Sequence, residues 1–496
     1  MRKTLFLKNA AIVTVNTLLL RLAGVIFRVW TAAKIGSEGM GLYQLTLSVY
    51  ILCSTFASTG ISTTVTRLVS DREALGDSAG GRTYTKKAAL LCMFVCSIFI
   101  PVLFFGADFI SNNLLGEART AASVQICGFA LPFVSLCACF KGYFLAKRQT
   151  LVPCLSQLIE QSVRILTVVF LIDKAGNSIE KKIAALVLGD IAAEAVACIF
   201  LFIFWIKNKK EKLRGRASYK EILRIALPIS GGKYINSLLR AAENILVPSK
   251  LAIFYASKSK ALSAIGVIKG MALPILLFPY ALLGATTSLL LPEISADAAQ
   301  NHTRHIAYTT QRAIKLTIIF SCFCGMIFFF TGDALGQLMY KNSEAGNILK
   351  ILAPLVPLMY IDSISDAILK SLDEQVTTFK NSVTDSIIRL VLIFLFLSSG
   401  GINAFIGIMY FSNLYTSALN FYKMYKITHF KANIINTFAL PTVFALFAGF
   451  TASSILNKFN LGNVSYIFIF FTISILIYMF LLVIFKLIKR EDVSFR

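Results

Sequence analysis

The chain has 496 residues, of which 56% are hydrophobic and 15% are charged, and its formal net charge is +24. Soluble domains average about 45–50% apolar and about 25% charged residues, so this composition excludes an ordinary soluble protein and is typical of a bilayer protein. The positive charge does not indicate a nucleic-acid partner, because lysine and arginine gather in alternate loops between apolar stretches, as the positive-inside rule requires.

Apolar stretches long enough to cross about 30 Å of hydrocarbon recur along the whole chain. They are continuous rather than alternating, which favours helices over strands. We therefore predict an all-α integral membrane protein of about 14 transmembrane helices. The predicted spans are 9–33, 40–66, 86–108, 121–146, 151–172, 183–206, 222–247, 263–292, 313–338, 348–371, 376–398, 402–425, 436–456 and 464–488.

One segment of the sequence is repeated. Residues 132–164 align without a gap with residues 357–389, and each copy lies in the middle of a series of apolar stretches. Each half has an even number of spans, so both halves enter the membrane from the same side, as parallel repeats of transporters do. We predict an N-lobe at 1–206, a basic cytoplasmic linker at 207–221, a C-lobe at 222–431 and two added helices at 432–496.

The charge bias between loops predicts the topology: both termini in the cytoplasm of a multi-pass plasma-membrane protein. The densest basic run is expected on the inner side and consists of Lys207, Lys209, Lys210, Lys212, Arg214, Arg216, Lys220 and Arg224. We expect it to fix topology and to contact anionic membrane lipids, with a substrate-gathering role as the alternative.

Several predicted spans contain prolines, including Pro132, Pro228, Pro279 and Pro357. Broken helices often line substrate paths in transporters, whereas ordinary packing kinks arise from the same residues. We predict breaks at these prolines and leave both interpretations open.

Two acid–base pairs lie inside predicted spans: Glu160 with Arg164, and Asp385 with Arg389. The i, i+4 spacing places each pair on one helix face, where the charges can neutralise each other. The pairs are equivalent under the repeat. We interpret them as structural pairs that hold equivalent helices in their bundles.

A second group of intramembrane cations is not balanced by acids in the sequence. Arg21 and Arg28 are seven residues apart and share nearly one face of the first span. The seventh span and the start of the eighth add further polar groups, with Glu243 as the one acid: Lys233, Asn236, Arg240, Glu243 and Lys269. Intramembrane charges are costly and usually line a cavity, so we predict an anion-binding site suited to phosphate. Snorkelling or structural cations are the alternative.

Two carboxylate pairs have i, i+4 spacing: Asp190 with Glu194, and Asp362 with Asp366. Like charges this close favour a shared proton or a bound cation. They are candidate ion-coupling sites, unless nearby cations neutralise them.

We predict no enzyme, no metal and no cofactor. The sequence has no phosphate-binding P-loop, since Arg82 follows Gly76–Gly81, and no nucleophile motif or dinucleotide turn. The ten cysteines form no C-x-x-C pair and lie in or near apolar spans, as buried small residues do. Transport coupled to membrane potential, Na⁺ or H⁺ is expected instead of ATP hydrolysis.

Two stretches resemble a known family: Arg21 to Tyr43 and Lys141 to Arg164. They are similar to stage V sporulation protein B and its relatives, in the polysaccharide flippase branch of the multidrug/oligosaccharidyl-lipid/polysaccharide (MOP) exporter superfamily, which also holds MurJ-type lipid II flippases. The resemblance covers essentially the whole chain. It implies a MATE-like fold of two six-helix lobes in parallel repeat plus two C-terminal helices.

The resemblance also implies a role in peptidoglycan, cell-wall or sporulation polysaccharide biosynthesis: flipping an undecaprenyl-diphosphate-linked oligosaccharide, such as lipid II, by alternating access. Lobe arginines would hold the diphosphate, and helices in 432–496 would form a lipid-tail groove. Arg21 matches the first arginine of the lipid II flippases, Arg28 lies one residue beyond their second, and Arg240 lies where they also place a cation. We expect a monomer with a lipid-linked substrate. The alternative is a cation-coupled multidrug antiporter of the same fold.

Overall fold

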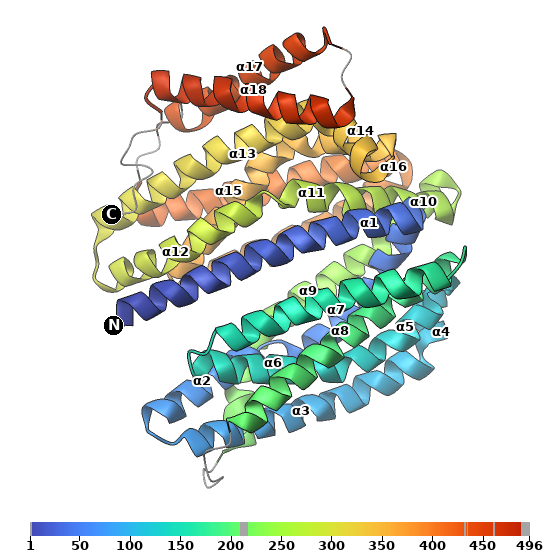
Figure 1. Cartoon of the computed structure of the whole chain (residues 1–496), viewed down its shortest axis with the longest axis vertical. Coiled ribbons are helices and arrows are strands. Elements are labelled where there is room, and N and C mark those ends of the chain that lie inside the picture. The colour runs from blue at the N-terminus through green and yellow to red at the C-terminus, as the bar shows by residue number, and fades with distance from the viewer. Residues whose placement is uncertain (1, 209–216, 431–432, 434, 460–461, 488–496) are drawn as a thin grey trace. The chain divides into compact units, whose positions relative to one another are not determined.

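The computed structural model describes residues 2–208, 217–430, 433, 435–459 and 462–487, and these are almost wholly helical, without strands (Figure 1). Its α-helices are α1 (Arg2–Ser58), α2 (Ile61–Ala74), α3 (Ser78–Phe105), α4 (Ala107–Phe109), α5 (Ala121–Cys127), α6 (Leu131–Ala146), α7 (Leu151–Lys174), α8 (Ile179–Lys207), α9 (Tyr219–Tyr255), α10 (Lys258–Ile265), α11 (Leu273–Leu277), α12 (Tyr280–Ala299), α13 (Thr303–Tyr340), α14 (Ser343–Leu352), α15 (Val356–Ser371), α16 (Gln375–Thr428), α17 (Leu440–Leu456) and α18 (Asn463–Ile484).

In the described part of the chain, 11 helical stretches are long and apolar enough to cross a membrane. Two of these stretches, which contain α1 and α16, hold two predicted spans each, divided where Gly36 and Gly401 adopt positive φ. A further predicted span lies in α9, which has 37 residues. Each predicted span thus coincides with helical residues, and the all-α membrane fold is confirmed.

The proline predictions are confirmed in part. Pro132 and Pro357 lie in the first turn of α6 and α15, directly after short 3₁₀ segments, and Pro279 lies between α11 and α12. The prediction at Pro228 is wrong, because α9 runs through it. A proline inside a helix removes one hydrogen bond and bends the helix without ending it when neighbouring packing holds both parts.

The backbone repeats the duplication seen in the sequence. A shift of 225 residues, from 131 to 356, carries α6 onto α15 and the preceding 3₁₀ turn, Gly128–Ala130, onto Ala353–Leu355. The same shift pairs residues with positive φ in the loops: Gly76 with Asn301, Gly116 with Lys341, Arg148 with Asp373, and Gly176 with Gly401. Left-handed backbone is uncommon outside glycine, so these matched turns show that the two copies share their loop geometry as well as their helices.

The chain forms two compact units, Met1–Gly266 and Val267–Arg496, called unit 1 and unit 2 below. The predicted lobes were defined by the duplication, and compactness alone does not test them, so that division stays a prediction. Unit 1 contains α9 and α10 in addition to the helices of the predicted N-lobe. The basic linker at 207–221 lies largely outside the described residues.

Unit 1 packs around α2, α3, α6 and α8, with small residues at its closest helix contacts. The core includes Tyr84, Tyr143 and Phe144, all almost fully buried. Gly142 of α6 lies against the backbone of Ser62 in α2, where a side chain would not fit. Helices in membranes associate through such close packing rather than through the hydrophobic effect.

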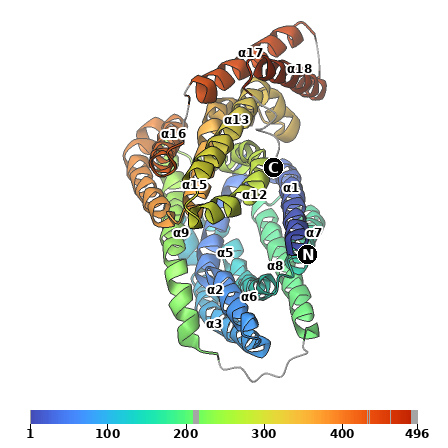
Figure 2. The ribbon, with the colours of Figure 1, turned by 90° about the vertical axis from the view of Figure 1, so that its left-hand side faces the viewer.

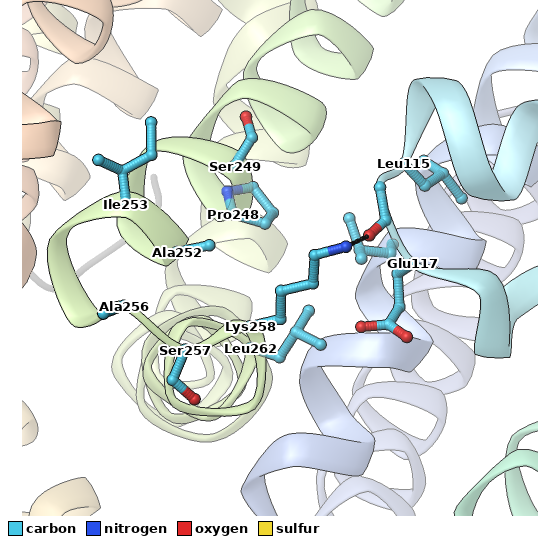
Figure 3. Close-up of a pocket in the computed structure, with 12 residues that line it drawn as sticks. Leu115, Glu117, Pro248, Ser249, Ala252, Ile253, Ala256, Ser257, Lys258 and Leu262 are labelled. Atoms are coloured by element: carbon cyan, nitrogen blue, oxygen red, sulfur yellow. Dashed lines mark hydrogen bonds between the residues drawn. The ribbon is translucent and has the colours of Figure 1, made fainter.

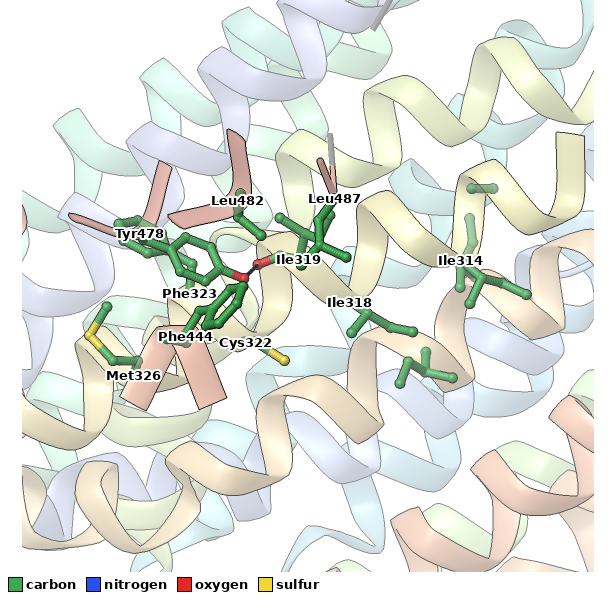
Figure 4. Close-up of a cluster of buried hydrophobic side chains, with 14 of the residues drawn as sticks. Ile314, Ile318, Ile319, Cys322, Phe323, Met326, Phe444, Tyr478, Leu482 and Leu487 are labelled. Carbon is green, nitrogen blue, oxygen red and sulfur yellow. Dashed lines mark hydrogen bonds between the residues drawn. The ribbon is translucent and has the colours of Figure 1, made fainter. Parts of the chain in front are cut away.

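Unit 2 packs around α13, which contacts α14, α15, α17 and α18. Figure 4 shows the core where Phe323 of α13 stacks on Tyr478 of α18 at a ring separation of 5.5 Å. The Tyr478 hydroxyl donates to the backbone oxygen of Ile319 at 3.0 Å. The two added helices are therefore anchored on α13 by aromatic packing and a hydrogen bond.

Candidate functional site

The first pair of predicted cations lies on the first half of α1. Arg21 is exposed and Arg28 is half-buried. Arg28 lies close enough to Tyr43 to interact with it electrostatically. Within the described residues, neither arginine makes an ion pair. Both guanidinium groups thus remain available to an external anion.

The predicted polar residues of α9 lie beside its buried face. That buried face contacts the second half of α1: Ser230 donates to the backbone oxygen of Thr59 at 2.8 Å, and Tyr234 stacks on Phe56 at 4.6 Å. Lys233 and Arg240 are exposed beside this buried face of α9. Asn236 and Glu243 are half-buried beside it. In the described part of the chain, Lys233 and Arg240 make no ion pair, whereas Asn236 and Glu243 have other interactions.

The structure does not bring all the predicted cations into contact. In Figure 2 the first half of α1 lies beside α7, and α9 lies at the opposite side of unit 1. Lys269 belongs to unit 2, in the π-helical segment Gly266–Ala272, with its ammonium 5.8 Å from the Phe405 ring centre. The anion-binding cluster as a whole therefore stays a prediction.

A charged network inside unit 1 centres on Arg164 of α7. Its Nε donates to Asp190 of α8 at 2.7 Å and its Nη2 donates to Glu160 at 3.1 Å. The Tyr43 hydroxyl also donates to Asp190, at 3.1 Å. The predicted Glu160–Arg164 ion pair is present, but Asp190 joins it, so α1, α7 and α8 share one network.

Lys141 of α6 enlarges this network. Its ammonium lies 3.3 Å from Glu160, and both side chains are mostly buried. Glu194, the partner that the sequence predicts for Asp190, interacts electrostatically with Lys141 and Glu160. Sequence reasoning missed Lys141, although it is a charged residue near the end of a predicted span, and it missed Tyr43, whose hydroxyl gives no charge signal.

In unit 2 the equivalent helices hold a simpler arrangement. Asp385 is buried, lies 3.2 Å from Arg389 and accepts a hydrogen bond from Ser412 at 2.6 Å. The predicted pair is therefore present here too. Asp362 accepts from Asn420 at 2.8 Å, and Asp366 pairs with Lys370 at 2.6 Å.

Three of the four carboxylates in the predicted pairs have partners, which is the alternative that the sequence left open. Asp190 is bonded to a guanidinium, and Asp366 to an ammonium, while Asp362 has an amide donor. A cation that binds at either pair would have to compete with these groups. The ion-coupling role stays a prediction, and Glu194 is the carboxylate of the four for which no side-chain hydrogen bond is observed in the described residues.

The second half of α1 and α10 cross very closely. A side chain at Gly41 would meet the backbone oxygen of Leu262, and one at Gly266 would meet that of Ser37. The hydroxyls of Ser37 and Ser263 lie 2.6 Å apart. The same 225-residue shift relates Gly41 to Gly266 and Ser37 to Leu262, so the contact is self-complementary, as at a two-fold axis. We call this contact the α1–α10 seam.

A cavity of about 420 Å³ lies next to the seam (Figure 3). Its wall is mostly apolar, with Lys258 donating to the Gly116 oxygen at 2.7 Å. Arg119 bridges Glu38 and Glu117, each at 2.8 Å, and neighbouring Arg119 holds the pKa of Glu117 below its usual value in spite of burial. These contacts fasten the 110–120 loop to α1 and to the start of α10.

No group of three or more metal-binding side chains that could hold an ion is found in the described ranges. The ten cysteines are all buried and free, and the sulfurs of Cys92 and Cys139 lie 3.8 Å apart. His302, between α12 and α13, and His305, in the first turn of α13, both contact Asp297 near the end of α12.

Comparisons with known proteins agree with these observations. The model of a family described as polysaccharide biosynthesis protein matches residues 6–282. Stage V sporulation protein B of Bacillus subtilis (strain 168) is 26% identical over 511 residues, covering 99% of this chain and 98% of that protein. Lipid II flippase MurJ of the same organism is 24% identical over 217 residues, and the match covers 41% of this chain and 40% of MurJ.

Solved structures share the fold. Lipid II flippase MurJ in an inward closed conformation superimposes with a TM-score of 0.74 at 16% identity, covering 95% of this chain and 98% of its own. An inward-facing multidrug resistance MATE family transporter of the MOP superfamily gives a TM-score of 0.67 at 13% identity. The match covers 84% of this chain and 98% of that transporter.

Proposed function

Because the chain belongs to the polysaccharide biosynthesis protein family of the MOP superfamily, we propose that it flips an undecaprenyl-diphosphate-linked oligosaccharide, such as lipid II, across the plasma membrane. It is a multi-pass membrane transporter by family and fold. The substrate, the residues that hold it and the transport cycle are the proposal.

The observation that carries the proposal is a set of cations in predicted spans that make no ion pair in the described residues: Arg21, Arg28, Lys233 and Arg240. A charge inside a bilayer is costly unless it has a partner or faces a cavity. A diphosphate supplies that partner, because guanidinium groups bind its oxygens in a bidentate manner. Asn236 and Glu243 would add polar groups to this surface, whereas Lys269, which the sequence predicts for the same site, belongs to unit 2.

The proposed cycle is alternating access. The α1–α10 seam joins the first predicted lobe to the second, and its self-complementary contact gives a discrete closed state. Release on the far side would require that seam to separate. No cofactor and no catalytic step are needed, since moving an anion out of a negative interior gains roughly 2.3 kcal/mol per charge per 100 mV. Na⁺ or H⁺ would be the alternative source of coupling.

The proposal includes the orientation of the chain in the membrane and its contacts with lipid. Both termini would be cytoplasmic, the protein would act as a monomer, and the basic linker would lie against anionic headgroups. The two helices α17 and α18, which pack on α13, would carry the lipid tail along their outer faces, where Phe447, Phe450 and Phe480 are exposed.

The second candidate function is a cation-coupled multidrug antiporter. It is favoured by the four carboxylates inside the helical units: Asp190, Glu194, Asp362 and Asp366. It is ranked second because each of Asp190, Asp362 and Asp366 already has a hydrogen-bonding or ionic partner. The four cations named above make no ion pair in the described residues.

Native mass spectrometry of the detergent-purified protein with undecaprenyl-diphosphate lipids tests the proposal. Arg21→Ala and Arg240→Ala should each lower saturable binding by roughly tenfold or more, the loss of one charge-assisted hydrogen bond or two. Arg224→Ala is the matched control, because Arg224 is an exposed cation of the same helix, more than four turns before Arg240. If Arg21→Ala and Arg240→Ala bind the lipid as well as Arg224→Ala does, the diphosphate site is contradicted and the antiporter becomes the favoured function.

A further inference from the structure

A buried arginine lies at the end of unit 1 that the charge pattern assigns to the cytoplasm. Arg82 of α3 is 3% exposed. Its guanidinium lies 4.0 Å above the ring of Trp205 in α8. Within the described residues, neither Nη1 of Arg82 nor Nε1 of Trp205 has a hydrogen-bond partner, although both atoms are buried.

Two adjacent donors without an acceptor are energetically unusual. A buried donor without a partner costs about 1–3 kcal/mol, and a charged one costs more. Stacking on an indole ring stabilises the guanidinium, but the ring supplies no acceptor for its N–H groups. An oxygen-bearing group that binds here would satisfy both donors.

Three acids of this end of unit 1 are engaged with other residues, whereas Asp71 of α2 is exposed. Glu73 pairs with Lys147 at 3.1 Å and Asp77 with Arg72 at 3.6 Å. Glu221 accepts a hydrogen bond from Tyr84. None of these acids is seen to contact Arg82, so its guanidinium has no counter-anion among the described residues.

The second repeat shows that the fold does not need this charge. The 225-residue shift relates Arg82 to Ala307 and Trp205 to Phe430. Phe430 is 1% exposed, and Ala307 packs against the same apolar core. The equivalent positions of unit 2 thus hold hydrocarbon and no charge, so the second repeat forms its helices without an arginine there.

The surroundings indicate which anion would bind. Trp205 is only partly buried, and tryptophan is enriched at the level of lipid headgroups. Further cations at this end also lie over aromatic rings: Lys87 over Tyr219 at 4.7 Å and Lys207 over Phe204 at 6.0 Å. At this depth the abundant anion is the phosphate of a phospholipid, and basic pockets at helix ends bind such headgroups.

We propose that Arg82 and Trp205 form a binding site for the phosphate of an anionic phospholipid in the inner leaflet. The site is separate from the transported substrate and does not rest on the proposed transport function. The guanidinium and the indole N–H both donate to phosphate oxygens, and the cations nearby favour a headgroup with net negative charge over a zwitterionic one.

Native mass spectrometry tests this proposal with phosphatidylglycerol and with phosphatidylcholine of the same acyl chains. Wild type should retain one phosphatidylglycerol in preference to phosphatidylcholine. Arg82→Ala should reduce that retention roughly tenfold or more. Trp205→Phe, which keeps the stacked ring but removes the N–H, should reduce it by less. Lys86→Ala is the charge-matched control, because Lys86 is an exposed cation of the same helix.

Equal retention by Arg82→Ala and Lys86→Ala would overturn the proposal. A second measurement covers a free anion: the unfolding temperature in detergent without added phospholipid, with inorganic phosphate titrated in. Stabilisation of wild type but not of Arg82→Ala by phosphate, without any loss of lipid retention, would assign the donors to a soluble anion and also overturn the lipid site. Arg82→Gln is the variant to use if Arg82→Ala does not fold.

Discussion

The two repeats share a backbone but hold different charges at equivalent positions. Lys141, which contacts Glu160 in unit 1, corresponds to Asp366 in unit 2, where the acid pairs with Lys370 of its own helix. The ion pair of Arg72 with Asp77 corresponds to Asp297 with His302, with the signs exchanged. Loop geometry and helix bounds have been retained through the duplication, whereas charge has diverged.

This difference locates specialised chemistry. A position that both repeats need for folding tends to keep its residue type, as Arg164 and Arg389 do. Positions that changed sign, such as Lys141, or that lost their charge, as at Ala307, mark what one half does and the other does not. The asymmetry of unit 1 therefore indicates which residues serve one half of the molecule and not the fold that both halves share.

The largest expected effect concerns the α1–α10 seam, where the repeats still match. Ser37→Cys with Ser263→Cys should form a disulfide under mild oxidation, because the two hydroxyls lie 2.6 Å apart. Under the proposed cycle the oxidised variant loses flipping in reconstituted vesicles and recovers it with a reductant. Substrate binding measured by mass spectrometry should persist. Unchanged flipping by the cross-linked protein would show that the seam does not open.

The next largest effect is expected at Lys141, whose equivalent in unit 2 is Asp366. Lys141→Ala should lower the free energy of unfolding by about 1.5–3 kcal/mol, because it removes a charge-assisted contact to a mostly buried Glu160. Asp366→Ala should cost under about 1 kcal/mol, because its partner Lys370 is half-exposed. Unfolding of both variants in detergent gives the comparison. Equal losses would mean that the two repeats use this position alike.

The glycine pair of the seam tests the symmetry itself. Gly41→Ala and Gly266→Ala each place a methyl group against the backbone of the other helix, at a cost of about 1–3 kcal/mol for overpacking. The two losses should be similar, since the contacts are equivalent. Gly24→Ala is the control, because nothing lies near its Cβ position. A large difference between Gly41→Ala and Gly266→Ala would contradict a two-fold relation.

The smallest effect is a pH dependence confined to the second repeat. Hydrogen bonds from His305 and His302 hold the pKa of Asp297 below its usual value. A depressed carboxyl pKa stabilises the fold above the ordinary value, about 3.9, and that contribution is lost as pH falls through the lowered pKa. Wild type should lose slightly more thermal stability than Asp297→Asn between pH 5 and pH 3. Parallel losses would exclude this contribution.

Much of the fold was predictable, because apolar length and breakers act locally. The glycines at 36 and 401 lie where new helices were predicted, and the duplicated segment predicted the match between α6 and α15. The i, i+4 ion pairs were also predictable, since one helix turn fixes their spacing. The break at Pro228 was not found, because packing against the second half of α1 holds α9 together on both sides of it.

By itself the sequence determined the membrane class, the positions of the spans, the duplication and the pairs within one helix. Only the tertiary structure decided which distant groups meet: Tyr43 with Asp190, Lys141 with Glu160, and Gly41 with Leu262. The physical reason is range. Helix formation and i, i+4 pairing depend on neighbours within one turn, whereas contacts between helices depend on how separate apolar surfaces pack.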